Sequence, residues 1–116
     1  MHALIIEDEP MIAILIEAQL RDLGFCSFDI TGDQAQAVAY AREHCPDLIT
    51  ADDKLTSGSG TDAVRRICSE HRVPVVFITG DHVAKQQVNA SYLEKPFLTD
   101  ELKVAVLSAL GTETVG

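Results

Sequence analysis

The stretch from Pro46 to Asp52 constrains the fold more than any other part of the chain, because its short apolar run, Leu48 to Ala51, stops abruptly at the carboxylate of Asp52. Residues 53–60 then have the Gly- and Ser-rich composition of a loop. In an open α/β sheet, ligands bind outside the carboxyl ends of the strands, where the strand order reverses. We therefore predict that residues 48–51 form a buried strand and that Asp52 is the reacting group of a site.

Similar short apolar runs recur along the chain and alternate with segments of helical pattern. Residues 3–6 are continuously apolar, which is typical of a parallel strand covered on both faces. Residues 82–90 are polar and irregular, with at most a turn or two of helix. The remaining predicted elements are strands at 25–30 (a weak strand and a candidate edge of the sheet), 74–78 and 91–94, and helices at 10–23, 33–42, 61–68 and 98–110.

The first and last helices have clear start, stop and packing signals. Pro10 suits the first turn of a helix, and Gly24 suits its end. Between them, the apolar residues that recur with helical spacing are Ile12, Leu15, Ile16, Leu20 and Leu23. In the last helix Thr99 is the candidate N-cap, and the residues expected on one apolar side are Leu102, Val106 and Leu110.

This order of elements, βαβαβαβ(α)βα, calls for a parallel sheet with helices on both faces. Right-handed crossovers leave few arrangements. We predict an α/β fold with a doubly wound five-stranded parallel sheet, the flavodoxin-like order 2-1-3-4-5, and a short or irregular fourth helix. The length of 116 residues suits one domain, expected at residues 1–110 and followed by a tail or linker start at 111–116.

The charge and cysteine content narrow the classes of partner and compartment. A net charge of −9 argues against nucleic-acid binding by this domain, because phosphate neutralisation needs clustered Lys and Arg. The charge is compatible with a bound cation or a cationic partner, and equally with simple solubility. Cys26, Cys45 and Cys68 match no metal-binding spacing and are expected to serve as small apolar side chains in a reducing cytoplasm. No signal peptide or membrane span is expected, since acids interrupt the N-terminal apolar run after Ile6.

Polar groups end four of the five predicted strands. Glu7 and Asp8 follow the first strand, and the later strands end at Asp52, Thr79 and Lys95. In the order 2-1-3-4-5 the first and third strands are neighbours, so three carboxylates would share one cleft. Without a counter-charge they would repel by on the order of several kcal/mol. Oxygen ligands that leave water in the coordination shell suit Mg²⁺.

Asp52 in such a cluster can act as a nucleophile, because carboxylates form acyl phosphates in several enzyme classes. Phosphoryl transfer needs mainly positioning and charge neutralisation. Mg²⁺ held by Asp8 and Asp52 would bridge the carboxylate and the incoming phosphoryl oxygens. Lys95 would pair with another phosphoryl oxygen, and the Thr79 hydroxyl would donate to a third.

Together these residues resemble the receiver domain of two-component response regulators, across nearly the whole chain. The matching positions are Glu7-Asp8-Glu9-Pro10, Pro46-Asp47-Leu48, Asp52, Leu55, Gly60, Thr79 and Lys95-Pro96-Phe97. The resemblance implies that Asp52 is the phosphoacceptor and that Asp8 is a direct Mg²⁺ ligand. It also implies that Glu7 supports the metal, often through water, and that the backbone carbonyl of Lys54 completes the protein ligands.

The resemblance further implies a signalling function. Thr79 and Lys95 would sense the phosphoryl group, and Tyr92 would be the aromatic switch residue. The phosphoryl donor would be the histidine of a sensor kinase or phosphotransfer protein. The added charge would change a surface that a downstream protein binds. The expected location is a bacterial cytoplasm. Such a domain catalyses its own phosphorylation and is not a turnover enzyme on external substrates.

Two features depart from the family pattern. Thr56 stands where the family usually has Pro, which predicts a looser turn. The spacing from Thr79 to Lys95 is shorter than in most receivers, and the missing residues fall on the fourth helix. Thr79-Gly80 after Phe77-Ile78 partly matches an atypical alphaproteobacterial subgroup with a Phe-Ala-Thr-Gly-type motif and a reduced fourth helix. We therefore hypothesise that reordering of residues 81–90 is the switch.

Other interpretations remain open. Taken singly, the acids at 7–9 could be a helix N-terminal charge cluster, Thr79 a strand-end hydroxyl, Lys95 a solvated side chain and Tyr92 a core residue. One rival function is a degenerate receiver that acts as a phosphorylation-independent interaction module. Another is a phosphatase or phosphotransferase with an Asp nucleophile, but Lys54 takes the place of the second acid that such enzymes carry two residues later.

Overall fold

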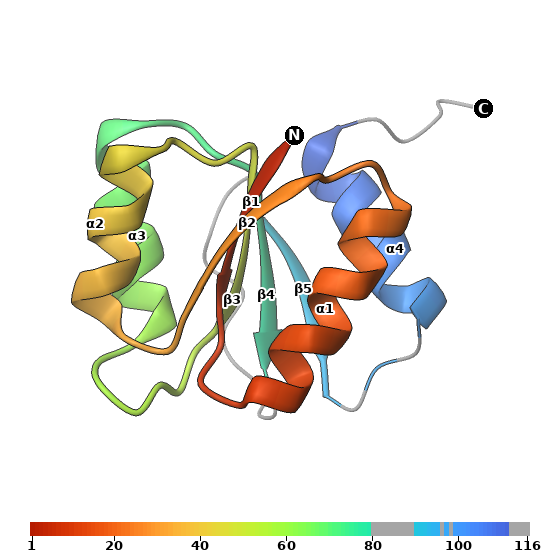
Figure 1. The fold of residues 1–116 in the computed structure, drawn as a ribbon, viewed down its shortest axis with the longest axis horizontal. Coiled ribbons are helices and arrows are strands. Elements are labelled where there is room, and N and C mark those ends of the chain that lie inside the picture. Colours follow the sequence, from red (N-terminus) through yellow and green to blue (C-terminus); the bar gives the residue numbers. More distant parts are fainter. Residues whose placement is uncertain (80–89, 96, 98, 112–116) are drawn as a thin grey trace.

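The computed structural model describes residues 1–79, 90–95, 97 and 99–111, and its five parallel strands lie in the order β2-β1-β3-β4-β5 (Figure 1). This order confirms the predicted doubly wound sheet and places the weak second strand at an edge. The strands are β1 (His2–Ile6), β2 (Ser27–Thr31), β3 (Leu48–Asp52), β4 (Val75–Thr79) and β5 (Ala90–Glu94). The described helices are α1 (Pro10–Asp22), α2 (Gln34–Glu43), α3 (Gly60–Glu70) and α4 (Thr99–Leu110).

Two helix layers enclose the sheet, with α2 and α3 on one face and α1 and α4 on the other (Figure 1). Alternate residues of β1 enter different cores: Ala3 and Ile5 pack with α1 and α4, whereas Leu4 and Ile6 pack with α2 and α3. Every residue of β1, β3 and β4 is buried. The central strands therefore read as continuous apolar runs, because neither face meets water.

Two glycines allow the loops at the carboxyl edge of the sheet to pack closely. A Cβ atom on Gly32 would lie 2.7 Å from both Cα and Cβ of Asp8. A Cβ atom on Gly60, the first residue of α3, would overlap the backbone carbonyl of Asp52. The start of α3 is held by Ser59, whose side chain accepts a hydrogen bond from the Asp62 backbone N–H. Glycine at these two positions therefore brings the neighbouring loops against the acids that follow β1 and end β3.

Two expectations for the helices are wrong in detail. Leu15 of α1 is 45% exposed, because the buried stripe of this helix runs instead through Ala13, Ile16 and Leu20. Thr99 is the first residue of α4 rather than its N-cap.

Expectations for the second strand and the cysteines also need correction. The strand begins at Ser27, two residues later than predicted, because Phe25 turns into the core beside α1 and α4. All three cysteines are free thiols. Cys68 packs against the α2–α3 core as expected of a small apolar residue, but Cys26 and Cys45 are exposed.

Several predictions fall outside the described residues. The short or irregular fourth helix and the proposed switch segment at 81–90 lie almost wholly in the undescribed range 80–89, and most of the tail at 111–116 lies in 112–116. These remain predictions. Within the described ranges, no helix has both the length and the apolar composition needed to cross a lipid bilayer.

The amphipathic packing of α4 can be tested with two identical substitutions on the same helix. Val106 is fully buried and Val104 is 64% exposed. We expect Val106→Ala to lower the free energy of unfolding by about 2 kcal/mol, because it removes buried methyl groups and leaves a cavity. Val104→Ala should change it by less than about 0.5 kcal/mol. Urea denaturation of both variants measures the difference, and equal effects would show that α4 packs with a different face.

Candidate functional site

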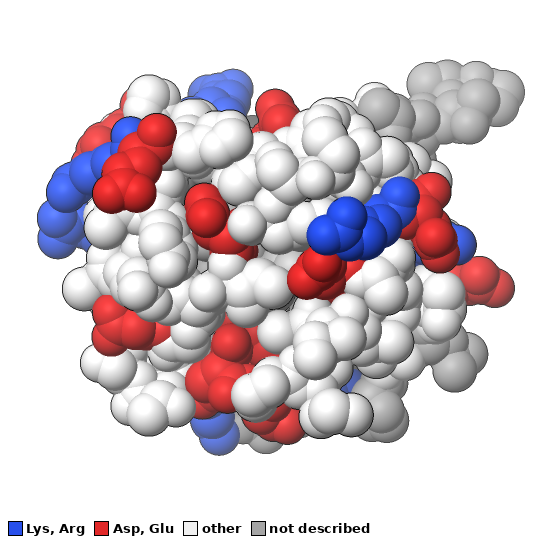
Figure 2. Space-filling model, in the orientation of Figure 1, with Lys and Arg blue, Asp and Glu red and all other residues white. Residues whose placement is uncertain are grey.

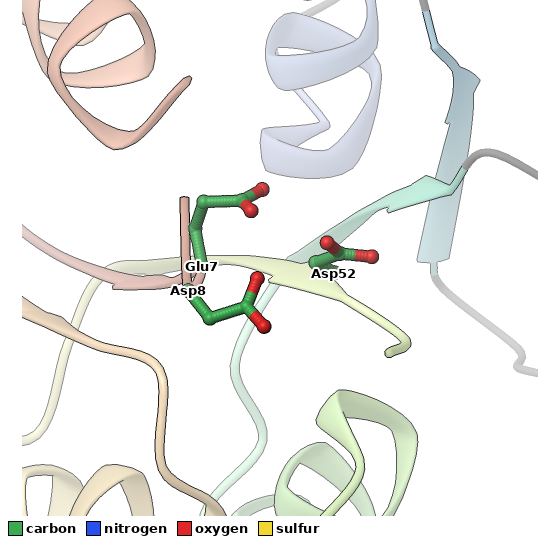
Figure 3. Close-up of side chains that lie close together, drawn as sticks. All are labelled: Glu7, Asp8 and Asp52. Carbon is green, nitrogen blue, oxygen red and sulfur yellow. The ribbon is translucent and has the colours of Figure 1, made fainter. Parts of the chain in front are cut away.

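Three acidic side chains meet where β1 and β3 end, as the strand order predicts. Glu7 and Asp8 follow β1, and Asp52 is the last residue of the neighbouring strand β3. One carboxylate oxygen from each lies within 4.8 Å of the others. Figure 3 shows the three carboxyl groups beside one another, and Figure 2 shows acidic side chains gathered at the edge where the strands end. Glu7 and Asp52 are only 4% and 8% exposed, whereas Asp8 is half-buried.

The Lys95 ammonium group is the counter-charge in this cluster. Its Nζ donates to Oδ2 of Asp52 at 3.0 Å and forms an ion pair with Oε1 of Glu7 at 3.3 Å. The Lys95 backbone N–H donates to the Thr79 carbonyl at 2.8 Å, which ties the residue to the end of β4. At an effective dielectric constant of about 20, two unit charges 4.8 Å apart repel by roughly 3 kcal/mol. One ammonium shared between two acids offsets part of this repulsion.

The pKa values at the site reflect burial as well as the neighbouring charges. Burial and the nearby charge of Asp52 raise the pKa of Glu7 to about 7, although the backbone N–H of Glu9 and the Lys95 ammonium act in the opposite direction. Burial lowers the pKa of Lys95, but its hydrogen bond to Asp52 and the charges of Glu7 and Asp52 outweigh burial and raise it overall. The site therefore favours a charged lysine while keeping one buried acid partly protonated near neutral pH.

The donor set and its unmet polar groups suit a hard divalent cation. Oε1 of Glu7 is buried, and its described contact is the 3.3 Å ion pair with Lys95 rather than a hydrogen bond. The three clustered ligand atoms are carboxylate oxygens, and Asp8 keeps access to water. Oxygen-rich ligation with retained water is what small divalent cations require.

The loop after β3 holds the other predicted site residue, Lys54. Its backbone N–H donates to Oδ1 of Asp52 at 3.3 Å, so its main chain lies at the site. An antiparallel bridge between Lys54 and Ser59 closes the loop at its base. The contribution of the Lys54 carbonyl to a metal site stays a prediction.

Thr79 and Tyr92, the predicted sensing and switch residues, lie on neighbouring strands. Thr79 is 7% exposed at the end of β4, one residue beyond Ile78, which pairs with Asp52. Tyr92 of β5 is half-buried, and its ring centroid lies 5.3 Å from that of Phe77. The structure therefore brings Thr79 to the edge that carries the acids, whereas Tyr92 packs beside the α2–α3 core. Their roles in switching stay predictions.

Sequence reasoning missed two contributions from the loop after β3. The Thr56 hydroxyl donates to Oδ2 of Asp8 at 3.0 Å. Asp53, in the loop predicted at residues 53–60, accepts hydrogen bonds from the hydroxyls of Thr61 and Ser59. The residue types were visible in the sequence, but no spacing rule indicates which hydroxyl of a polar loop reaches which acid.

The raised pKa of Glu7 predicts a pH-dependent stability difference. A carboxyl group whose pKa is about 7 when folded and about 4.5 when unfolded stabilises the fold fully only below pH 4.5, and this stabilisation is lost as pH rises through 7. In EDTA, we expect the free energy of unfolding of Glu7→Gln, relative to that of the wild type, to increase by on the order of 1–3 kcal/mol between pH 4.5 and 7.5. Urea unfolding at several pH values measures this gain. Glu43→Gln, on the exposed end of α2, is the control, and a pH-independent Glu7→Gln difference would contradict the prediction.

Comparisons with known proteins agree with this geometry. The family model described as "Response regulator receiver domain" matches residues 3–107. The phyllosphere-induced regulator PhyR of Methylorubrum extorquens is 36% identical over 113 residues, which cover 92% of this chain and 42% of PhyR. The chain spans about half the length of the curated relatives it matches.

Solved structures of receiver domains are also similar to this chain. The receiver domain of Erythrobacter litoralis PhyR is 30% identical, with a TM-score of 0.85 over 99% of this chain and 93% of that one. The receiver domain of the Pseudomonas aeruginosa sensor kinase PA1611, whose structure is described with a magnesium ion in the active-site cleft, is 31% identical, with a TM-score of 0.81 over 95% and 97% of the two chains. The predicted fold and family are thus confirmed, and this chain belongs to the receiver-domain family of two-component response regulators.

Proposed function

We propose that Asp52 accepts a phosphoryl group from the phosphohistidine of a sensor kinase or phosphotransfer protein, with Mg²⁺ at the acidic site. The observation that carries this proposal is the Lys95 ammonium, which donates a hydrogen bond to the buried carboxylate of Asp52, one of three clustered acids. The protein would serve as a signalling switch and would not turn over external substrates. The intact set of acids and lysine argues against a degenerate receiver.

The transfer requires little from the protein beyond positioning and charge. An oxygen of the ionised Asp52 carboxylate attacks phosphorus, the new O–P bond forms, and the N–P bond to the donor imidazole breaks with its electron pair returning to nitrogen. No general base is needed, because the nucleophile carries no proton to remove. Lys95 holds the acceptor carboxylate in place and offers positive charge to the transferred group.

Glu7, Asp8 and Asp52 are the residues that would hold Mg²⁺, together with the backbone of Lys54. When bound, Mg²⁺ would neutralise the clustered acids and the charge of the phosphoryl oxygens. The buried Oε1 of Glu7, which accepts no hydrogen bond from the described residues, and the Mg²⁺ named for the PA1611 receiver support this assignment. Thr79, buried at the adjacent strand end, would donate its hydroxyl to the phosphoryl group once it is on Asp52.

The surface beside the site suits a protein donor. Helix α1 starts directly after the acids, and its outward residues Met11 and Ile14 are 79% and 62% exposed. Exposed apolar side chains next to a reactive group favour docking of a partner protein. We propose that the donor protein docks on α1, and that the phosphoryl charge of about −1.5 to −2 biases a different surface read by a downstream protein. The role of residues 81–90 in that switch stays a prediction outside the described residues.

Phosphorylation at Asp52 is tested directly with small donors. On incubation with acetyl phosphate or phosphoramidate and Mg²⁺, we expect the intact mass to rise by one phosphoryl group. The Asp52→Asn variant and an EDTA-treated sample should show no such rise, because each lacks either the nucleophile or the cation. Asp62→Asn, an exposed acid at the start of α3, is the matched control and should be phosphorylated like the wild type. Equal phosphorylation of Asp52→Asn would refute the assignment.

The role of Lys95 is tested by removing its charge. We expect Lys95→Gln to slow phosphorylation by phosphoramidate roughly 100-fold, as typically happens when one preorganised donor to a reacting oxygen is lost. Lys103→Gln removes an ammonium whose ion pair among the described residues is a 3.9 Å contact with Asp22, so its rate should match that of the wild type. Time courses of intact mass give both rates. A Lys95→Gln variant that remains folded and reacts at the wild-type rate would exclude the proposed role.

A further inference from the structure

Asp8 has a hydrogen-bond donor that the proposed phosphoryl chemistry does not use. The Thr56 hydroxyl donates to Oδ2 of Asp8 at 3.0 Å and joins two loops that are far apart in the sequence. Lys95 serves the other two acids, since its described side-chain contacts are with Asp52 and Glu7. Among the described residues, Thr56 is thus the side chain that donates to Asp8.

The loop that carries Thr56 is anchored on both sides. Lys54 and Ser59 form an antiparallel bridge across its base. The carboxylate of Asp53, adjacent to the acceptor, receives hydrogen bonds from the hydroxyls of Ser59 and Thr61. The contact between Thr56 and Asp8 is therefore made by a loop whose base is already held in place.

The backbone of Asp8 is restricted from another direction. Gly32 packs so closely that a Cβ atom would lie 2.7 Å from Cα and Cβ of Asp8. The remaining freedom of this half-buried acid is rotation of its side chain, and the hydrogen bond from Thr56 restricts that rotation. Restricting a ligand before the cation arrives lowers the conformational entropy lost on binding.

We infer that Thr56 is a positioning residue that holds the Asp8 carboxylate in the orientation that binds the divalent cation, an inference that rests on the proposed Mg²⁺ site. A neutral hydroxyl donates one hydrogen bond and leaves the second Asp8 oxygen able to bind a cation. Thr56 stands where the resembled family usually has Pro, which has no hydroxyl to donate.

The expected effect on affinity is modest because Thr56 is exposed and water can replace its hydroxyl. Loss of a partner that orients a metal ligand typically weakens metal binding by about 10–100-fold in buried sites. For Thr56→Val, which has the same shape without the donor, we expect the Kd for Mg²⁺ to rise about 3–10-fold. Thr56→Ser keeps the hydroxyl and should stay within about 2-fold of the wild type.

Isothermal titration calorimetry with MgCl₂ on the wild type, Thr56→Val and Thr56→Ser measures these affinities. Ser57→Ala removes the neighbouring hydroxyl of the same loop, which makes none of the described side-chain hydrogen bonds, and it should leave the Kd unchanged. Urea unfolding in EDTA shows whether Thr56→Val alters the stability of the metal-free fold. In an Asp8→Asn background, Thr56→Val should have no further effect on Mg²⁺ binding, because the group that it positions has been changed.

The outcomes separate this inference from the function on which it rests. If the wild type binds Mg²⁺ and Thr56→Val binds it equally well, the positioning role is wrong while the metal site stands. The role is also wrong if Thr56→Ser weakens binding as much as Thr56→Val, or if Thr56→Val acts as strongly in the Asp8→Asn background. A wild type that binds no Mg²⁺ overturns the metal site and this inference together.

Discussion

The contact of one ammonium group with two buried carboxylates is the interaction on which the site depends. Lys95 lies 3.0 Å from Asp52 and 3.3 Å from Glu7. Without it, three acids within 4.8 Å of one another would oppose folding. Burial of the Glu7 carboxyl, together with the nearby charge of Asp52, raises its pKa to about 7 despite the Lys95 ammonium. The three acids and one lysine leave a net negative charge at a partly buried site. Such a site favours binding of a cation.

Sheet topology explains why these groups meet. Strands β1 and β3 are neighbours in a parallel sheet, so the acids that follow them emerge at the same edge. Backbone hydrogen bonding of Lys95 to Thr79 brings the ammonium from β5 across the end of β4. The close packing at Gly32 and Gly60 then brings the surrounding loops against Asp8 and Asp52. The same strand order therefore buries the central strands and brings the acids and Lys95 together at one edge of the sheet.

Much of this arrangement could be predicted from the sequence because it follows from periodicity and from strand ends. Continuous apolar runs indicated buried parallel strands, and the polar residue after each run indicated the edge that carries Asp52. The exposure of Leu15 was not predictable, because helical spacing shows which residues share a side but not how far the sheet covers it. Nor was the bond from Thr56 to Asp8, which depends on the path of a loop rather than on a repeating pattern.

If Asp8 and Asp52 belong to one cation site, the free energy of unfolding must depend on the concentration of Mg²⁺. A single ion that binds only the folded protein should raise this free energy by about 1.4 kcal/mol for each tenfold increase in Mg²⁺ above its Kd. We predict that slope for the wild type and no comparable slope for the protein carrying both Asp8→Asn and Asp52→Asn. A wild type whose stability is unaffected by Mg²⁺, or a double variant with the same slope, would contradict the account.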